Sequence, residues 1–197
     1  AICTGLSKAR NETPAVPVED AHALFSVAVR GGCLRAALVR SKAEGAVTVT
    51  MMPVRVLNLF VNMNRGGAET VVMNYYRALD RSRIQFDFMV HRPFRGDYED
   101  EIERLGGRIF RMPPIRLENL FRYQKELDIF FCEHPEHKII HSHMSELGYF
   151  AFRETYRHGV PVRICHAHNC PSNFDFKTVP RFLLQRLCLR HITHMFA

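Results

Sequence analysis

The chain has 197 residues, 47% of them hydrophobic, so it can bury one good core, whereas a complete two-domain enzyme would be cramped. No stretch reaches the roughly 18 uninterrupted apolar residues of a membrane span, so we expect a soluble protein. The formal net charge of +7 suits an anionic ligand or membrane face, and without helix-turn-helix, RNA-binding or zinc-finger signatures we expect no nucleic acid partner. Six cysteines without framework spacing, and no recognisable secretory signal, favour reduced thiols in the cytoplasm.

The first 50 residues show no convincing periodic pattern. Prolines and a glycine pair are mixed there with short apolar patches. We expect translation to start at Met51 or Met52, and we interpret residues 1–52 as a poorly structured N-terminal extension that comes from read-through or a misassigned start. The alternative is a genuine extension with a helix near residues 20–30.

From Pro53 onward, strand and helix patterns alternate along the chain. Apolar runs predict strands that end near residue 62 and cover residues 86–91, 108–111, 139–141, 162–168 and 192–196. Helical spacing predicts helices over residues 68–79, 97–105, 117–132, 146–158 and 179–190. Repeated β-α units with buried strands predict an α/β fold with a doubly wound, Rossmann-like parallel sheet over residues 53–197.

The most informative motif is the turn Asn64-Arg65-Gly66-Gly67-Ala68-Glu69, where a buried strand passes directly into a helix. The carboxyl edge of a parallel sheet carries the ligands, and two glycines there allow backbone N–H groups and the helix terminus to approach an anion. The turn lacks the third glycine of a dinucleotide site and the Lys-Ser/Thr of a triphosphatase loop. A tight turn without any ligand is the competing interpretation.

Two histidine pairs, His141/His143 and His166/His168, fall at the ends of later strands and thus at the same edge as the glycine turn. Residues two apart in a strand point to the same face, so each pair can present two imidazoles together. A metal site is one interpretation, but CxxC or HxxxH spacing and a suitably placed carboxylate are missing, so we expect no metal. We favour His141 and His166 as satisfied core residues, with the other member of each pair lining a cleft.

Taken together, these features resemble the N-terminal domain of a family 4 glycosyltransferase with the GT-B fold, a family of retaining enzymes that build polysaccharides and glycolipids. The resemblance spans about residues 54–197. Besides the glycine turn, it rests on the order and spacing of Phe86-Asp87-Phe88, Gly96-Asp97-Tyr98, Leu105-Gly106-Gly107, His141-Ser142-His143, Gly159-Val160-Pro161 and Ala167-His168-Asn169.

On the donor side, the resemblance implies that Gly66 and Gly67 approach the diphosphate and the transferred sugar of a nucleotide-sugar donor. Glycosyl transfer passes through an oxocarbenium-like state, and the leaving diphosphate needs N–H donors and cations. Glu69, in the first helical turn, is expected either to hold the glycine loop or simply to favour the helix dipole.

On the acceptor side, the resemblance places His168 near the transferred sugar, where we expect it to be the catalytic residue that orients or hydrogen-bonds a sugar hydroxyl. Asn64, His143 and Asn169 are the expected contacts to a saccharide or lipid-linked acceptor. Local backbone capping is the competing role for His143 and Asn169. The basic surface predicts peripheral contact with an anionic membrane, at its cytoplasmic face.

A GT-B enzyme of this kind also has a C-terminal donor domain with a Glu-x7-Glu element, which these 197 residues do not contain. We therefore expect the chain by itself to catalyse little or no transfer, and no cofactor to be required. Receiver modules and nucleotide-sugar epimerases are disfavoured, because the acidic cluster of the former and the three-glycine turn of the latter are missing. A non-catalytic sugar-binding or interaction domain of the same fold stays open.

Overall fold

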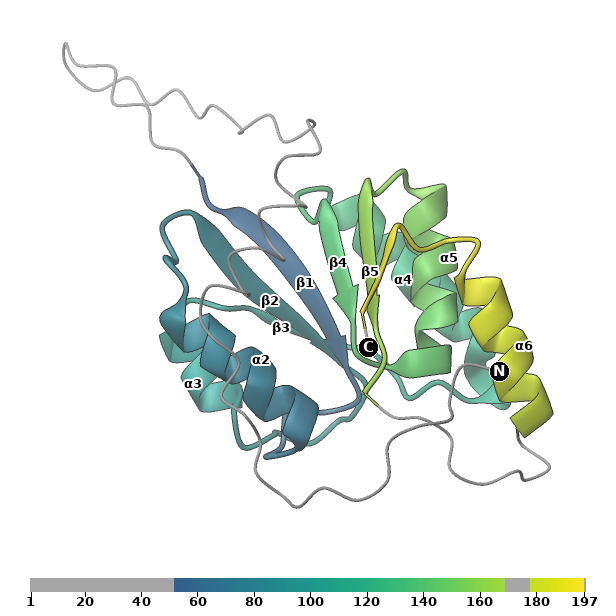
Figure 1. The fold of residues 1–197 in the computed structure, drawn as a ribbon, viewed down its shortest axis with the longest axis horizontal. Helices are drawn as coiled ribbons and strands as arrows, with labels where there is room; N and C mark the ends of the chain where they lie inside the picture. Colours follow the sequence, from purple (N-terminus) through teal and green to yellow (C-terminus); the bar gives the residue numbers. More distant parts are fainter. Residues whose placement is uncertain (1–51, 169–177, 197) are drawn as a thin grey trace, which may run out of the picture. The chain divides into compact units, whose positions relative to one another are not determined.

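The computed structural model describes residues 52–168 and 178–196. The expected N-terminal extension up to residue 51, the alternative helix at residues 20–30, and Asn169 lie outside the described residues. The described part forms one sheet of six parallel strands in the order β3-β2-β1-β4-β5-β6 (Figure 1). The predicted doubly wound α/β fold is confirmed.

The strands are short and separated by helices, as the alternating pattern predicted. The strands are β1 (Val54–Phe60), β2 (Ile84–Val90), β3 (Ile109–Arg111), β4 (Ile139–Ser142), β5 (Val162–His166) and β6 (His194–Phe196). The helices are α2 (Gly67–Ala78), α3 (Glu99–Arg104), α4 (Leu120–Glu133), α5 (Gly148–Arg157) and α6 (Thr178–Cys188). All predicted elements exist, with ends that differ by a few residues.

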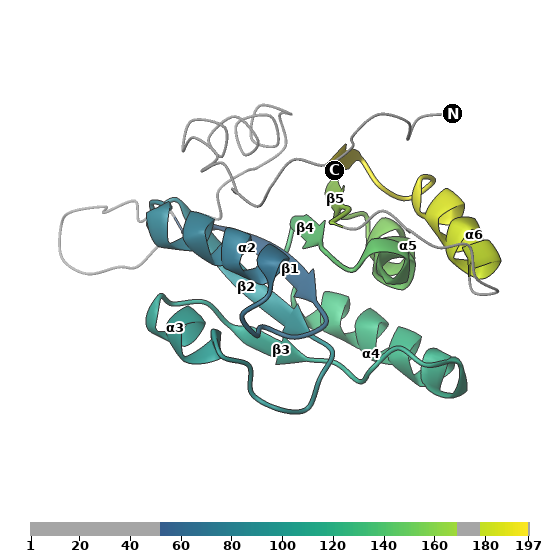
Figure 2. The ribbon, with the colours of Figure 1, turned by 60° about the horizontal axis from the view of Figure 1, so that its bottom comes forward.

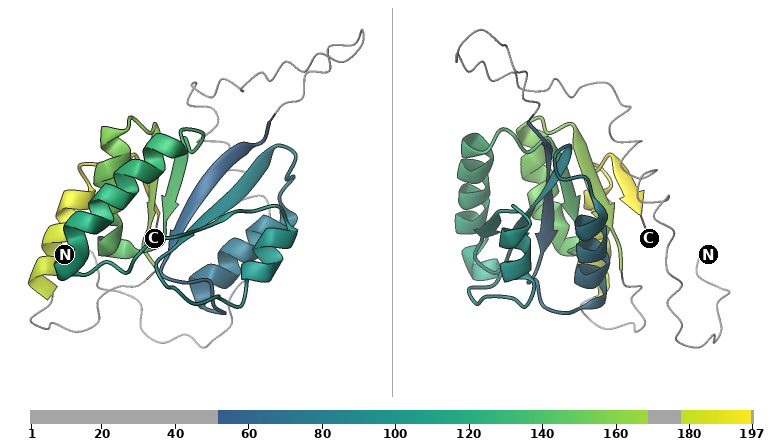
Figure 3. Two further views of the ribbon diagram at one scale, coloured as in Figure 1. Left: turned by 180° about the vertical axis from the view of Figure 1, so that it is seen from behind. Right: turned by 90° about the vertical axis from the view of Figure 1, so that its left-hand side faces the viewer.

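Helices cover both faces of the sheet, and Figures 2 and 3 show α2 and α4 on opposite sides of it. On one face, the Tyr76 ring of α2 stacks on Phe86 of β2, with ring centroids 5.2 Å apart. On the other face, α4 packs its apolar side against β1, β2 and β4 in a core that includes Leu57, Leu59, Met89, Tyr123, Leu127, Phe130 and Ile140. Burial of these large apolar side chains is the main stabilising contribution to the domain.

Two predicted helices begin later than expected, each behind a short 3₁₀ turn, at Leu117–Asn119 and at Ser145–Leu147. In the first, the Asn119 side chain accepts a hydrogen bond from the Arg116 N–H at 3.0 Å and donates one to the Pro114 carbonyl at 2.9 Å. Asparagine favours such local bonds over helical ones. The α-helix therefore starts only at Leu120.

The predicted helix stop at Gly106-Gly107 is confirmed. Gly106 has a φ of +88°, a left-handed conformation that favours glycine, and its N–H donates to the Glu103 carbonyl. Gly107 donates to the Ile102 carbonyl, which completes the helix cap and turns the chain into β3.

Among the described residues, no helix combines the length and the apolar character that crossing a membrane requires.

Candidate functional site

The sheet reverses its strand order between β1 and β4, because β1 pairs with β2 on one side and with β4 on the other. In open α/β sheets, ligands bind outside the carboxyl ends of the strands at such a switch point. The glycine turn follows β1 and the first histidine pair belongs to β4 and the residue after it. Both predicted motifs therefore meet at this edge of the sheet.

The glycine turn is held by short-range backbone hydrogen bonds. Gly66 donates its N–H to the Asn64 carbonyl at 2.8 Å, and the Thr70 N–H donates to the Gly66 carbonyl at 3.0 Å. Gly66 is the N-cap of α2, so the Gly67 N–H lies at the first helical position, which has no acceptor inside the helix. Of the two glycines, Gly67 is thus the one whose N–H is placed to bind an anion.

A neighbouring loop that contains Gly96, Asp97 and Tyr98 braces this turn. The Tyr98 N–H donates to the Met63 carbonyl at 3.0 Å, and Asp97 accepts a hydrogen bond from the Arg65 N–H at 3.3 Å. A Cβ on Gly96 would lie 2.8 Å from backbone atoms of Met63, which explains why only glycine fits there. The sequence contained this segment as part of the resemblance but gave no sign of its bracing role.

Glu69 folds its carboxylate back over the start of α2. A Cβ added to Gly66 would lie 2.3 Å from the Glu69 Oε2 atom, so the carboxylate occupies the space beside the bare Gly66 backbone. This placement fits the role in which Glu69 holds the glycine loop, which stays a prediction. The carboxylate also lies near the positive end of the helix dipole.

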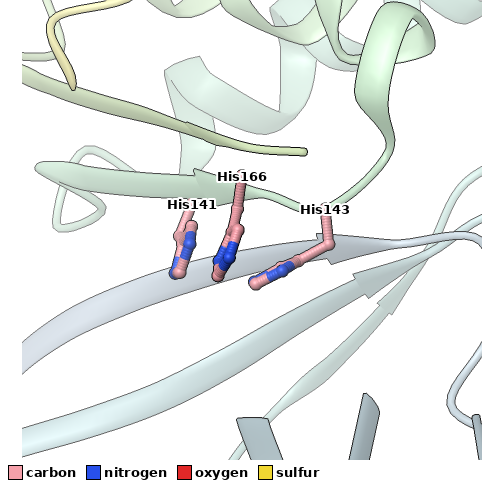
Figure 4. Close-up of side chains that lie close together, drawn as sticks. All are labelled: His141, His143 and His166. Carbon is pink, nitrogen blue, oxygen red and sulfur yellow. The ribbon is translucent and has the colours of Figure 1, made fainter. Parts of the chain in front are cut away.

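Four imidazoles gather at the ends of β4 and β5, and Figure 4 shows three of them close together. The ring centroids of His141 and His143 are 4.1 Å apart, and those of His166 and His168 are 4.2 Å apart, so each pair presents both rings together, as predicted. The two pairs also touch each other, with 5.6 Å between the centroids of His141 and His166.

His143 connects this cluster to the rest of the site. Its ring stacks on Phe60, the last residue of β1, with a centroid separation of 4.3 Å, and its backbone N–H donates to the Leu59 carbonyl. Its Nδ1 atom is hydrogen-bonded to Nε2 of His168 at 2.8 Å. The expected acceptor residue and the expected catalytic residue are therefore a hydrogen-bonded pair.

Electrostatics keep the cluster neutral. Burial and the neighbouring imidazoles lower the pKa of His141 to about 3 and that of His166 to about 4, and they lower the pKa of His143 well below its usual value. Burial also lowers the pKa of His168, while the Glu69 carboxylate opposes this shift. Glu69 therefore lies near enough to influence His168, which links the glycine turn to the histidines.

The expected division into satisfied core histidines and cleft histidines is wrong for the first pair. His143, expected in the cleft, is only 9% exposed, whereas His141 is partly exposed. The Nε2 atoms of both residues are buried and have no hydrogen-bond partner among the described residues. His143 is buried because its ring stacks on Phe60, which shields it from solvent. The residue pattern of one strand does not reveal this contact with another strand.

Of the expected site residues, the structure thus brings together Gly66, Gly67, Glu69, His143 and His168 at one edge. Asn64 belongs to the same turn through its carbonyl group, and Asn169 lies outside the described residues. Sequence reasoning missed Phe60 as the ring that supports His143; its position at the end of the first strand was the available signal.

This arrangement, a doubly wound parallel sheet with a glycine turn and histidines at the switch point, defines the Rossmann-like class of domains that bind ligands at the carboxyl edge. Residues 66–197 match the family described as the glycosyl transferase 4-like domain. The chain therefore belongs to this glycosyltransferase family.

A curated relative agrees with this assignment, and solved structures agree with the fold. The chain is 38% identical over 147 residues to the protein named "Putative glycosyltransferase EpsF" of Bacillus subtilis (strain 168), a match that covers 73% of this chain and 38% of that protein. It shares its fold with HepE of Anabaena, solved with UDP and glucose, at 14% identity and a TM-score of 0.51 over 72% of this chain and 37% of the other. It also shares its fold with MurG of Acinetobacter baumannii, at 10% identity and a TM-score of 0.50 over 73% of this chain and 40% of the other. The chain thus spans less than half the length of each.

Proposed function

We propose that the chain forms the acceptor-side domain of a glycosyltransferase that moves a sugar from a nucleotide-sugar donor to a saccharide or lipid-linked acceptor, with retention, in polysaccharide or glycoconjugate biosynthesis. The observation that carries this proposal is the meeting of the glycine turn with the His143–His168 pair at the switch point. A phosphate group and a sugar ring both need such a mixture of backbone donors and neutral polar side chains.

On the donor side, the Gly67 N–H at the start of α2 contacts the diphosphate, which the open space beside Gly67 admits, while Gly66 leaves room for the Glu69 carboxylate that holds the turn. HepE, which has the same fold, was solved with UDP and glucose, and this supports a nucleotide sugar as the donor. Glycosyl transfer places growing negative charge on the leaving diphosphate, which N–H donors at a helix terminus stabilise.

On the acceptor side, His168 hydrogen-bonds a hydroxyl group of the reacting sugars, and His143 fixes the orientation of its ring. A neutral imidazole pair can donate at one end and accept at the other, and the lowered pKa values keep the pair neutral at pH 7. Asn64 and Asn169 complete the acceptor contacts in this proposal.

The test is an assay of nucleotide release from a panel of nucleotide sugars by the full-length gene product that contains this chain. His168→Ala should reduce kcat/KM by about 100-fold or more, as expected for the loss of a positioned catalytic side chain. His158→Ala is the matched control, because His158 pairs with Asp128 on α4, away from the glycine turn, and should leave the rate unchanged. NMR of the product's anomeric proton distinguishes retention from inversion.

No release with any donor, from a protein that still binds a saccharide, would replace this proposal by a non-catalytic sugar-binding domain. Equal activity of the wild type and His168→Ala would leave a transferase but remove His168 from its site. We also propose that residues 1–197 alone transfer no sugar, since the matched relatives are much longer, and the same assay on the 197-residue chain tests this.

We further propose that the protein works in the cytoplasm and touches an anionic membrane peripherally, where a lipid-linked acceptor would be presented. The net charge of +7 supports this contact. Co-sedimentation with vesicles that contain anionic lipid should be strong at low salt and weak at high salt. Binding that does not depend on the salt concentration, or no binding at all, would refute the proposed membrane contact.

A further inference from the structure

We propose that His141, His143 and His166 form a binding site for a zinc ion, which is held through one ring nitrogen of each imidazole. The three residues lie at the ends of two adjacent strands. His141 pairs with Ile164 in the register of β4 and β5, and two residues further along lie His143, directly after β4, and His166, the last residue of β5. Parallel register therefore places all three side chains on the same face of the sheet.

The spacing of the rings suits a shared metal ion. One ring nitrogen of each of the three histidines lies within 4.8 Å of those of the other two. Two nitrogens on one tetrahedral zinc are about 3.4 Å apart, because each Zn–N bond is about 2.1 Å. The His166 ring centroid lies 5.4 Å from that of His143 and 5.6 Å from that of His141, while those of His141 and His143 are 4.1 Å apart, so side-chain rotations are needed to direct one nitrogen of each ring at a shared ion.

The hydrogen bonding of the cluster points to a missing ligand. The Nε2 atoms of His141 and His143 are both buried and lack a hydrogen-bond partner among the described residues, although buried polar atoms are normally paired. Each is a nitrogen lone pair or an N–H group that no other described residue engages. A metal ion between the rings would use these nitrogens as ligands.

The fourth histidine fits the role of a supporting residue outside the metal shell. His143 Nδ1 is 2.8 Å from His168 Nε2. If His143 binds the metal through Nε2, its Nδ1–H donates to His168 Nε2, and such an outer hydrogen bond fixes the tautomer and orientation of a metal-binding histidine. Zinc would then also hold the His168 ring in one orientation.

The donor set selects the metal. Imidazole nitrogen suits zinc, copper, nickel and iron, whereas calcium and magnesium require oxygen ligands. No carboxylate belongs to the group of three, and three histidines leave one coordination position open, as in zinc sites that bind an exchangeable ligand. We commit to zinc because its tetrahedral preference matches three converging side chains and one open position.

The experiment is a titration of the metal-free 197-residue chain with Co²⁺, a spectroscopic substitute for zinc, followed by competition with Zn²⁺. We expect one ion per chain, visible absorption bands of a tetrahedral cobalt site, and displacement by Zn²⁺. His141→Gln and His166→Gln should each weaken binding by about 100-fold or more, and His168→Gln by about 10-fold through the lost outer hydrogen bond.

A second histidine group provides the matched control. Asp128, Cys132 and His158 also place ligand atoms within 4.8 Å of one another, on α4 and at the end of α5. If metal binding is lost in His158→Gln but kept in His166→Gln, the ion belongs to that group and the proposal is wrong. Absence of binding to the wild type would equally overturn it.

Should a histidine variant fail to fold, X-ray absorption of the wild-type zinc complex decides instead. A shell of nitrogen and oxygen ligands without sulfur supports the proposed site, whereas a sulfur ligand, which the three histidines do not offer, would refute it. Neither measurement depends on sugar transfer, so failure of the zinc site and failure of the proposed enzymatic function remain distinguishable.

Discussion

Replacing Asp87 by asparagine should lower the free energy of unfolding by about 3 kcal/mol, because this change removes the charge at the centre of a buried ion network. Asp87 lies on β2 with a fully buried side chain. It accepts hydrogen bonds from Arg55 at 2.5 Å, from the Arg108 side chain at 2.7 Å and backbone N–H at 3.0 Å, and from His137 at 2.9 Å. Its carboxylate thus joins the region before β3 and β4 to β1 and β2.

The magnitude follows from what asparagine keeps and loses. Its side-chain oxygen can still accept from the Arg108 N–H, but its NH₂ group meets donors instead of an acceptor. Removing one partner of a buried ion pair costs about 3–5 kcal/mol. The side chain of Arg55 is 22% exposed and that of Arg108 is 37% exposed, so water can solvate them partly, and the lower end of this range applies.

The pH dependence gives an independent check. Burial by itself would raise the pKa of Asp87, but the hydrogen bonds from His137, Arg108 and Arg55 outweigh it and hold the pKa well below its ordinary value. A depressed carboxyl pKa stabilises the folded state above the unfolded pKa of about 4, and this contribution is lost as the pH falls through the folded pKa. The free energy of unfolding of the wild type should therefore exceed that of Asp87→Asn by the same amount at every pH from 7 to 5.

The assay is urea unfolding of the 197-residue chain followed by circular dichroism. Asp100→Asn is the matched control, because Asp100 pairs with Arg95 while its side chain is 77% exposed, and it should change stability by less than about 0.5 kcal/mol. A difference below about 0.5 kcal/mol for Asp87→Asn at pH 7 would refute the stabilising role of the network.

Two further changes test the acid sensitivity of the core and the bracing of the glycine turn. Burial lowers the pKa of His91, whose ring is hydrogen-bonded to the Tyr123 hydroxyl. Below about pH 6.5, His91 therefore binds a proton in the unfolded state but not in the folded state, and the free energy of unfolding falls. His91→Gln should reduce this loss between pH 7.5 and 5.5 in urea unfolding; an unchanged slope would contradict it. Gly96→Ala should cost about 2 kcal/mol, because its Cβ meets the Met63 backbone, whereas the control Gly67→Ala, with no atom within 4 Å of its Cβ, should cost less than about 0.5 kcal/mol in thermal unfolding. Equal effects of the two glycine changes would exclude a steric role for Gly96.

The sequence by itself determined the order and type of the elements, because apolar periodicity is a local property of the chain. The buried run of β1, the glycine turn and the helical spacing of α2 are all contained in residues 54–78 and could be read there. The sequence also located both histidine pairs at strand ends. It misplaced the starts of α4 and α5, where side-chain hydrogen bonds and a local turn compete with the helix.

Only the tertiary structure decided which strands are neighbours. The reversal between β1 and β4 places Phe60 against His143, and the pairing of β4 with β5 adds His166 to the same cluster. Motif spacing argued against a metal site, because such spacing detects only ligands that lie near one another in the sequence. The zinc site that we propose combines histidines from the ends of two strands. Residues distant in sequence, such as Asp87 and His137, meet in the same way, because sheet pairing is set by burial and register across the whole domain.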